Sequence, residues 1–312
     1  MTARSYLYVP GDQPGKLTKA VARGADALIA DLEDAVAPAA KDAARLTVAR
    51  WLDSLADRRN RPDAPMPEIW VRVNPAGPDG SPPAADLVTA VHPAVTGIVQ
   101  AKSADAADLV TLAQALDEAE ARARISQGTL KVVALVESAA ALAALPALAA
   151  APRVCRLHLG EADLVADLGM EPGPDGIELM SIRTSVVIAS AAAGIEPPAG
   201  PVSTSLTDHE ALRRGSETLR RLGFAGRSAI HPGQLAVINE VFTPSPEQER
   251  RARALVERFT ESVEAGHGVF TDDEGQMVDQ AVIRAATRVL ARARLRRGRP
   301  ASQDDQSGGD RR

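Results

Sequence analysis

The sequence has a single cysteine, Cys155, among 312 residues. One thiol excludes an intramolecular disulfide and a zinc site built from several thiolates, and we expect it to lie in a buried strand in a reducing compartment. Aromatic residues are also scarce, at 3% of the chain, although hydrophobic residues make up 45%. The core must therefore consist mainly of Ala, Val, Leu and Ile, a composition that suits strands covered by Ala-rich helices.

The chain also lacks an excess of positive charge and a long apolar segment. Its 36 Lys and Arg against 41 Asp and Glu give a net charge of -5, which offers no general attraction for nucleic acid. The longest run rich in Ala and Leu, residues 139–151, is too short to span a bilayer and contains Pro146. The first residues lack the apolar core of a secretory signal. We therefore expect a cytoplasmic protein that binds neither nucleic acid nor membrane.

Short apolar runs with strand character alternate with helical patterns along most of the chain. The predicted strands are residues 5–9, 27–31, 69–74, 97–102, 131–137, 155–160, 200–203 and 227–231. The predicted helices are residues 41–55, 104–123, 139–150, 176–193 and 207–222. This order predicts βαβ units with parallel strands, and eight of them predict an α/β protein with a closed (β/α)8 TIM barrel. An open, doubly wound sheet is the alternative, but no G-x-G-x-x-G pattern follows any strand.

The pattern changes after the eighth predicted strand. Thr243-Pro244-Ser245-Pro246 is a helix start signal, and a last helix is predicted over residues 280–295 after a polar loop. We expect three parts: a catalytic (β/α)8 barrel over residues 1–240, a helical cap segment over residues 241–297, and a disordered tail over residues 298–312.

Charged and polar side chains stand where the predicted strands end. Active sites of α/β barrels lie at the carboxyl ends of the strands, so these positions predict one shared site. They are Asp31, Glu33, Asp34, Arg72, Asn74, Lys102, Glu137, Glu161, Asp163 and His231.

The stretch ALIADLEDAV, residues 27–36, ends an apolar strand in three carboxylates. Buried carboxylates are costly unless a positive charge meets them, so we expect this strand end to face a cation and basic side chains. A solvated loop with a helix N-cap is the alternative. Four residues are predicted to support the site, through water or by orienting basic groups, rather than to bind an ion. They are Asp31, Glu33, Asp34 and Lys102.

Glu137 and Asp163 have the chemistry of a magnesium site. Mg²⁺ prefers hard oxygen ligands and keeps several waters, whereas zinc favours His and Cys, and His231 is the one histidine at a predicted strand end. For each carboxylate taken alone, the alternative is a helix N-cap or an ion pair with Arg72 or Lys102. The pair together predicts Mg²⁺.

A resemblance to a known family is carried by seven segments in order: RSYLYVPGDQPGKLTKA, ADALIADLEDAVAPAAKDAAR, WVRVNP, ALVESAAAL, LGEADLVADLGM, AIHPGQLAVINEVFTPS and EGQMVD. From Arg4 to Leu290 the chain resembles the citrate lyase β-subunit-like family, the CoA-ester lyases of the HpcH/HpaI aldolase superfamily. The resemblance implies a (β/α)8 barrel that uses Mg²⁺, with Mn²⁺ as an alternative ion. It also implies cleavage or formation of a 3-hydroxyacyl-CoA ester, such as malyl-, citramalyl- or citryl-CoA, to or from an acyl-CoA and a 2-keto acid.

The resemblance further implies roles for particular residues. Glu137 and Asp163 would be the protein ligands of Mg²⁺, and Arg72 would hold the carboxylate of the keto-acid fragment. Asp279, in the segment MVD, matches the acid/base aspartate of the family. Residues implied to line the CoA and substrate side are Tyr8, Val9, Lys19, Ala162, Ile230 and His231. Family members assemble as trimers or hexamers whose C-terminal segment caps the adjacent subunit, so a homo-oligomer with shared active sites is expected.

The chain departs from the family pattern at two places. It reads Gly-Glu-Ala-Asp at residues 160–163 where many members read Gly-Ala-Glu-Asp, and Ala-Lys at residues 101–102 where many read Pro-Lys. The metal aspartate is retained, but the lining of the keto-acid pocket differs.

Alternatives to a CoA-ester lyase stay open. A thioesterase could use the same scaffold to hydrolyse a hydroxyacyl-CoA, with water as the acceptor. A non-catalytic or carrier-dependent subunit could act only within a larger lyase complex. Schiff-base chemistry through Lys102 is a further alternative for the mechanism.

Overall fold

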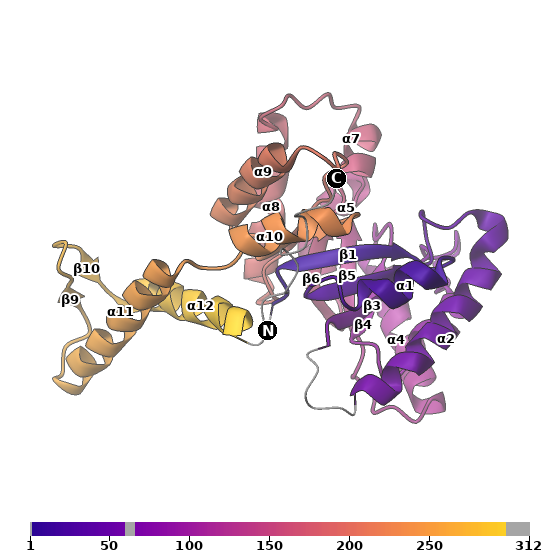
Figure 1. Cartoon of the computed structure of the whole chain (residues 1–312), viewed down its shortest axis with the longest axis horizontal. Coiled ribbons are helices and arrows are strands. Elements are labelled where there is room, and N and C mark those ends of the chain that lie inside the picture. The colour runs from indigo at the N-terminus through magenta and orange to yellow at the C-terminus, as the bar shows by residue number, and fades with distance from the viewer. Residues whose placement is uncertain (1, 60–65, 298–312) are drawn as a thin grey trace, which may run out of the picture. The chain divides into compact units, whose positions relative to one another are not determined.

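The computed structural model describes residues 2–59 and 66–297 (Figure 1). Of the described residues, those between 2 and 242 form one compact unit, and those between 243 and 297 form a second. In the first unit parallel strands pair in sequence order and close into a barrel because β1 also pairs with β8. The strands are β1 (Ser5–Pro10), β2 (Ala27–Asp31), β3 (Glu68–Val73), β4 (Gly97–Gln100), β5 (Lys131–Val136), β6 (Val154–Leu159), β7 (Ala199–Gly200) and β8 (Gly226–Ala229). The predicted (β/α)8 barrel is confirmed.

Helices connect the strands and surround the barrel (Figure 1). They are α1 (Pro14–Ala20), α2 (Lys41–Arg59), α3 (Ala84–Ala90), α4 (Ala106–Arg122), α5 (Ala139–Ala143), α6 (Leu145–Ala149), α7 (Glu161–Leu168), α8 (Met180–Ala192), α9 (His209–Leu222) and α10 (Leu235–Val241). Within the described residues, no helix combines the length and the apolarity needed to cross a membrane.

The strands are buried on both faces, which is why they read as continuous apolar runs. Their outer faces pack with the helices in one large hydrophobic cluster, and their inner faces form a second cluster that includes Tyr6, Ile29 and Trp70. Gly97 makes room for the indole of Trp70, because a Cβ at Gly97 would lie 2.2 Å from Lys131 O and 2.7 Å from the Trp70 ring. Tyr6 and Trp70 thus fill the barrel interior beside small residues such as Ala27, whereas Trp51, Phe224 and Phe242 belong to the outer cluster.

Proline explains two differences from the predicted elements. The seventh strand is limited to Ala199–Gly200, because Pro198 and Pro201 flank it and proline has no N–H for a strand ladder. The predicted helix over residues 139–150 is divided into α5 and α6, because Pro146 stands in the first turn of α6. Both changes leave the barrel order intact.

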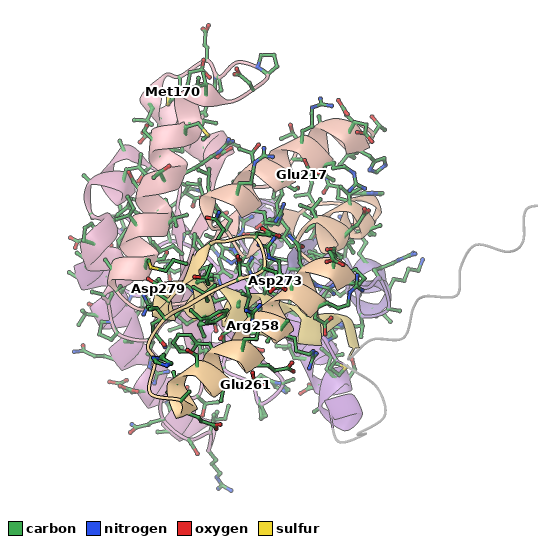
Figure 2. All side chains as sticks on the ribbon, turned by 90° about the vertical axis from the view of Figure 1, so that its left-hand side faces the viewer. Met170, Glu217, Arg258, Glu261, Asp273 and Asp279 are labelled. Carbon is green, nitrogen blue, oxygen red and sulfur yellow. The ribbon has the colours of Figure 1, made fainter. Side chains whose placement is uncertain are left out.

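The second unit is a helical hairpin. Helices α11 (Pro246–Glu264) and α12 (Gln280–Arg297) pack against each other and are joined by the antiparallel strands β9 (Phe270–Thr271) and β10 (Met277–Val278). Helix α11 begins at Pro246, as the sequence signal indicated, and Ser245 and Gln248 form a capping box at its start. Arg258 of α11 donates to Asp273 at 2.7 Å, and Figure 2 shows these two residues close together. Contacts within the hairpin therefore hold its two helices and its connecting loop together.

Candidate active site

The second strand ends in a carboxylate that is paired with an arginine of the next strand. Asp31 closes β2, and the strand register places it opposite Arg72 of β3. Arg72 Nε and Nη2 donate to the two carboxylate oxygens of Asp31 at 2.7 and 2.5 Å. Burial lowers the pKa of Arg72, but the hydrogen bonds to Asp31 and the negative charges of the groups around it together raise the pKa, so the guanidinium stays charged. Arg72 is thus one cation that the carboxylates of ALIADLEDAV require.

Arg72 keeps donors that Asp31 does not use. A guanidinium has five N–H groups, and the two bonds to Asp31 occupy Nε and one hydrogen of Nη2. Nη1 lies 3.2 Å from Glu33 Oε2, and the guanidinium stacks over the ring of Tyr8, with 4.9 Å from its carbon to the ring centroid. The edge formed by Nη1 and Nη2 can therefore donate to the carboxylate of a ligand.

Asp31 and Lys41 fix the loop that follows β2. Asp31 Oδ1 accepts from Glu33 N at 2.9 Å, and Asp31 Oδ2 accepts from Ala35 N at 3.1 Å. Lys41 Nζ, at the start of α2, donates to the backbone oxygen of Glu33 at 2.7 Å and to Asn74 Oδ1 at 2.9 Å. Sequence reasoning missed Lys41, because a lysine in the first turn of a helix is normally a surface charge. The loop is therefore held from β3 and from α2.

Lys102 follows β4 and joins two parts of the site. Its Nζ donates to Glu33 Oε1 at 2.5 Å and lies 3.4 Å from Asp34 Oδ1, while its backbone N–H donates to Glu137 Oε1 at 2.6 Å. The hydrogen bond from Lys102 to Glu33 raises the pKa of the lysine. A Schiff-base lysine needs a lowered pKa, so this geometry argues against Schiff-base chemistry at Lys102.

Glu137 and Asp163 bring two carboxylates to the same pocket from β5 and α7. Glu137 follows β5 and is 4% exposed, whereas Asp163 stands in the exposed first turn of α7. Burial raises the pKa of Glu137 to about 7, with the hydrogen bond from Lys102 N opposing the rise and the negative charge of Asp163 adding to it. A Cβ at Gly160 would lie 2.8 Å from Glu137 Cβ, so glycine is needed for this approach. The positive charge of Arg72 offsets only part of this rise.

The donor set fits magnesium better than zinc. In the described part of the chain, no three His, Cys, Asp or Glu side chains form a metal-binding group, whereas structural and catalytic zinc sites use three or four such ligands. Mg²⁺ is commonly held by one or two carboxylates, with waters and substrate oxygens completing six ligands. Glu137 and Asp163 match that pattern.

Most of the predicted site residues line one pocket at the carboxyl ends of the strands. The pocket has a volume of about 350 Å³, and Leu135, Leu159 and Val202 give it an apolar part. The predicted residues that line it are Tyr8, Asp31, Asp34, Arg72, Glu137, Glu161, Ala162, Asp163 and Ile230. The structure therefore brings together an acidic group, an arginine and an apolar wall in one space.

Other predicted residues lie outside the pocket lining. Glu33 is 3% exposed and contacts Arg72 and Lys102 from the loop after β2. Val9 is buried in the cluster between strands and helices, and Lys19 is exposed on α1. His231 is exposed, and its Nδ1 accepts from Gly233 N at 3.1 Å, which caps the turn after β8.

Asp279 belongs to the C-terminal hairpin (Figure 2). Its Oδ1 accepts from Ala281 N at 2.8 Å and from Val282 N at 3.1 Å. Asp279 is therefore the N-cap of α12, which is the local role that its position before Gln280 suggests.

Glu161 also lines the pocket, where an arginine of the next helix pairs with it. Arg183 of α8 donates from Nε and Nη2 to the two oxygens of Glu161 at 2.6 and 2.9 Å. This two-point pair ties the first turn of α7, which also contains Asp163, to the neighbouring helix. The sequence marks Glu161 as a strand-end residue but carries no signal for its partner, since Arg183 follows in a helix with other polar residues.

Comparisons with known proteins agree on one family. A sequence profile of the HpcH/HpaI aldolase/citrate lyase family matches residues 4–232. The citrate lyase subunit beta of Haemophilus influenzae is 32% identical over 292 residues, which cover 93% of this chain and 97% of that protein. The (3S)-malyl-CoA thioesterase of Cereibacter sphaeroides is 33% identical over 290 residues, covering 93% and 94%.

A solved structure is similar over the same extent. The crystal structure of CitE from Mycobacterium tuberculosis, in complex with magnesium, acetoacetate and coenzyme A, matches with a TM-score of 0.69 at 30% identity. The match covers 93% of this chain and 97% of CitE. With the barrel and the acidic pocket described above, these similarities establish that the chain belongs to the HpcH/HpaI aldolase/citrate lyase family and is a lyase of that family.

Proposed function

We propose that the chain is a Mg²⁺-dependent carbon–carbon lyase that cleaves or forms a 3-hydroxyacyl-CoA ester, such as malyl-, citramalyl- or citryl-CoA. The products of cleavage would be an acyl-CoA and a 2-keto acid. The observation that supports this proposal most is the pocket in which two carboxylates, Glu137 and Asp163, lie with the charged Arg72. The CitE structure with magnesium, acetoacetate and coenzyme A adds support from a relative.

The reaction needs loss of the β-hydroxyl proton, stabilisation of the thioester enolate and protonation of its α-carbon. Glu137 and Asp163 would hold Mg²⁺, which when bound polarises the hydroxyl and carboxylate oxygens of the substrate. Arg72 would orient the carboxylate of the keto-acid fragment through its Nη1 and Nη2 edge. Burial raises the pKa of Tyr8 above its usual value, so its phenol stays protonated and can donate a hydrogen bond inside the pocket. Asp279 would transfer the proton at the thioester α-carbon.

The remaining predicted contacts divide between the two ends of the substrate. We assign the apolar part of the pocket, with Ala162 and Ile230, to the keto-acid side, and His231 beside it to a contact with the substrate. Tyr8 and the exposed Lys19 are assigned to the CoA side, together with the backbone of Val9, whose side chain is buried. The positive charge of Lys19 suits the CoA phosphates.

Incubating the purified chain with Mg²⁺ and a panel of malyl-, citramalyl- and citryl-CoA tests the proposal. We expect free 2-keto acid to appear with at least one ester, and EDTA to stop its release until Mg²⁺ or Mn²⁺ is added back. The keto acid is followed by coupled reduction or by mass spectrometry. Full activity in excess chelator would contradict the role of the ion.

The same assay separates the alternatives. A thioesterase releases hydroxy acid and free CoA without keto acid, and the similarity to (3S)-malyl-CoA thioesterases makes this the second candidate. A carrier-dependent subunit leaves all CoA esters unchanged when it is alone, and the similarity to citrate lyase beta subunits makes this the third.

Asp279 is proposed to act on the active site of a neighbouring chain in a homotrimer or hexamer. The hairpin that carries it is a unit distinct from the barrel. Mixing two inactive variants, Glu137→Ala and Asp279→Ala, under conditions of subunit exchange should restore activity. If the site pairs one barrel with the next hairpin, a random one-to-one mixture has about one quarter of its sites intact in a closed, symmetric ring.

The mixing experiment needs proof that subunits exchange. Mass spectrometry of differently labelled variants gives that control. A mixture that exchanges subunits and stays inactive would mean that Asp279 serves its own barrel, or that its N-cap role at α12 is its whole role.

A further inference from the structure

Lys102 adopts a backbone conformation that a residue with a side chain rarely takes. Its φ is 50°, and among the described residues only Arg124 and Arg153 are other non-glycine residues with positive φ. In this left-handed region the Cβ approaches a backbone carbonyl oxygen, which is unfavourable for L-residues other than Asn and Asp. Such a conformation persists only where the surroundings enforce it, so something around Lys102 must hold it.

The conformation directs the backbone N–H of Lys102 at a candidate metal ligand. The N–H donates to Glu137 Oε1 at 2.6 Å, across from β4 to β5. The preceding residue, Ala101, continues the strand pairing by donating to Val73 O at 3.4 Å. The chain therefore leaves the sheet at Lys102, and the same residue combines the left-handed turn with the hydrogen bond to Glu137.

The side chain of Lys102 forms an ion pair with the loop after β2. Its Nζ donates to Glu33 Oε1 at 2.5 Å, and Glu33 is 3% exposed although the lysine itself is 46% exposed. Glu33 is fixed in turn by Arg72 and by the loop that Asp31 caps. One residue thus connects the acidic loop after β2 to Glu137, by its side chain at one end and its backbone at the other.

We propose that Lys102 is a positioning residue for the metal site: its ion pair with Glu33 holds its backbone in the left-handed conformation, so that its N–H fixes the orientation of the Glu137 carboxylate. This inference rests on the proposed role of Glu137 as a ligand of Mg²⁺. When a fixed donor holds one oxygen of a carboxylate, the direction of the other oxygen is fixed as well. Hydrogen-bond partners that orient a metal ligand in this way change its affinity for the metal. Lys102 itself touches neither ion nor substrate in this proposal.

Two substitutions separate the side chain from the backbone. Lys102→Ala keeps a Cβ but loses the ion pair, so the backbone should relax and the N–H should leave Glu137. Lys102→Gly also loses the ion pair, but glycine adopts positive φ without strain, so the N–H can stay in place. We therefore expect Lys102→Ala to weaken metal binding by about 10- to 100-fold, the usual effect of losing an orienting partner, and Lys102→Gly to weaken it clearly less. Lys102→Arg, which keeps a cation for Glu33, should bind close to wild type.

Metal binding is measured directly, without turnover, by Mn²⁺ titration followed by electron paramagnetic resonance, with Mg²⁺ as competitor. Arg124 provides a matched control, since its φ is 58° and it is exposed at the end of α4, outside the pocket lining. Because glycine adopts positive φ without strain, Arg124→Gly should melt at a higher temperature than Arg124→Ala. Neither Arg124 variant should change metal affinity.

The outcomes distinguish this inference from the proposed function. If wild type binds the metal and Lys102→Ala binds it equally well, or if Lys102→Gly is no better than Lys102→Ala, the positioning role is overturned and the lyase proposal stands. If wild type binds neither Mn²⁺ nor Mg²⁺, both are overturned. If Lys102→Ala does not fold, the comparison of Lys102→Gly with Lys102→Arg decides, because the proposal requires both to bind metal within about tenfold of wild type.

Discussion

Replacing Glu137 with glutamine is expected to abolish metal-dependent turnover and to leave the barrel folded. The amide oxygen can still accept the hydrogen bond that Lys102 N gives to Glu137 Oε1 at 2.6 Å, and the side-chain volume is nearly unchanged. What disappears is the negative charge that would hold Mg²⁺. Losing a partner that only orients a metal ligand costs about 10- to 100-fold, so losing the ligand should lower kcat/KM by more than about 100-fold.

The measurement is kcat/KM over a range of Mg²⁺ concentrations, with circular dichroism and thermal melting to report the fold. Burial raises the pKa of the Glu137 carboxyl to about 7, so above that pH its ionised form opposes folding in the metal-free protein. Metal-free Glu137→Gln should therefore melt no lower than metal-free wild type at pH 8. Asp167→Asn is a matched control, because this α7 carboxylate also accepts a backbone N–H, from Ala139 at 2.7 Å, outside the pocket lining.

Two results would contradict the assignment of Glu137. One is turnover of Glu137→Gln within about tenfold of wild type, less than an orienting partner usually contributes. The other is an equal loss in Asp167→Asn, which would point to a general effect of removing a carboxylate rather than to an ion site.

Replacing Arg72 with lysine is expected to cost about 2 to 4 kcal/mol of transition-state stabilisation, the range measured for one preorganised donor in other enzymes. Lysine keeps the charge but not the planar fork. In the structure that fork is already divided, because Nε and Nη2 bind Asp31 while Arg72 also lines the pocket. An ammonium group that pairs with Asp31 has no second edge with which to hold a substrate carboxylate.

The loss should appear in kcat/KM with the proposed substrates, measured together with the melting temperature. Arg153→Lys is the control, since Arg153 also pairs with a buried carboxylate, Glu120, at 2.7 Å, and neither residue lines the pocket. Both variants break a two-point pair, so both should lose some stability, but only Arg72→Lys should lose activity. Near-normal rates for Arg72→Lys would limit Arg72 to a structural role with Asp31.

The barrel could be predicted from the sequence because each of its strands is buried on both faces. Burial on two faces makes a strand a continuous apolar run, and the run Ala27–Asp31 has no exposed residue. The ends of helices and strands were harder to predict from the sequence where a proline interrupts an element. The effect of Pro146 on a helix and of Pro198 and Pro201 on a strand depends on the hydrogen bonds that each position needs, which follow from the fold.

The residue types at the site could be predicted from their places at strand ends, but their partners could not. Asp31 and Arg72 are 41 positions apart in the chain, and only the register between β2 and β3 sets them opposite each other. The left-handed turn at Lys102 has no signal in its own residue type, because neither Lys102 nor its neighbours Ala101 and Ser103 is a glycine. The roles of Glu137, Asp163 and Arg72 remain predictions to be tested as described above.

Three of the contacts that build the pocket join residues that are far apart in the chain. The bonds from Arg72 to Asp31, from Lys102 to Glu33 and from Lys102 to Glu137 join positions 41, 69 and 35 residues apart. Each can form only after a long loop has closed, which costs chain entropy and delays such contacts during folding. If the helices have formed but the strands β2, β3, β4 and β5 have not yet paired, the chain contains all of these side chains but has no active site.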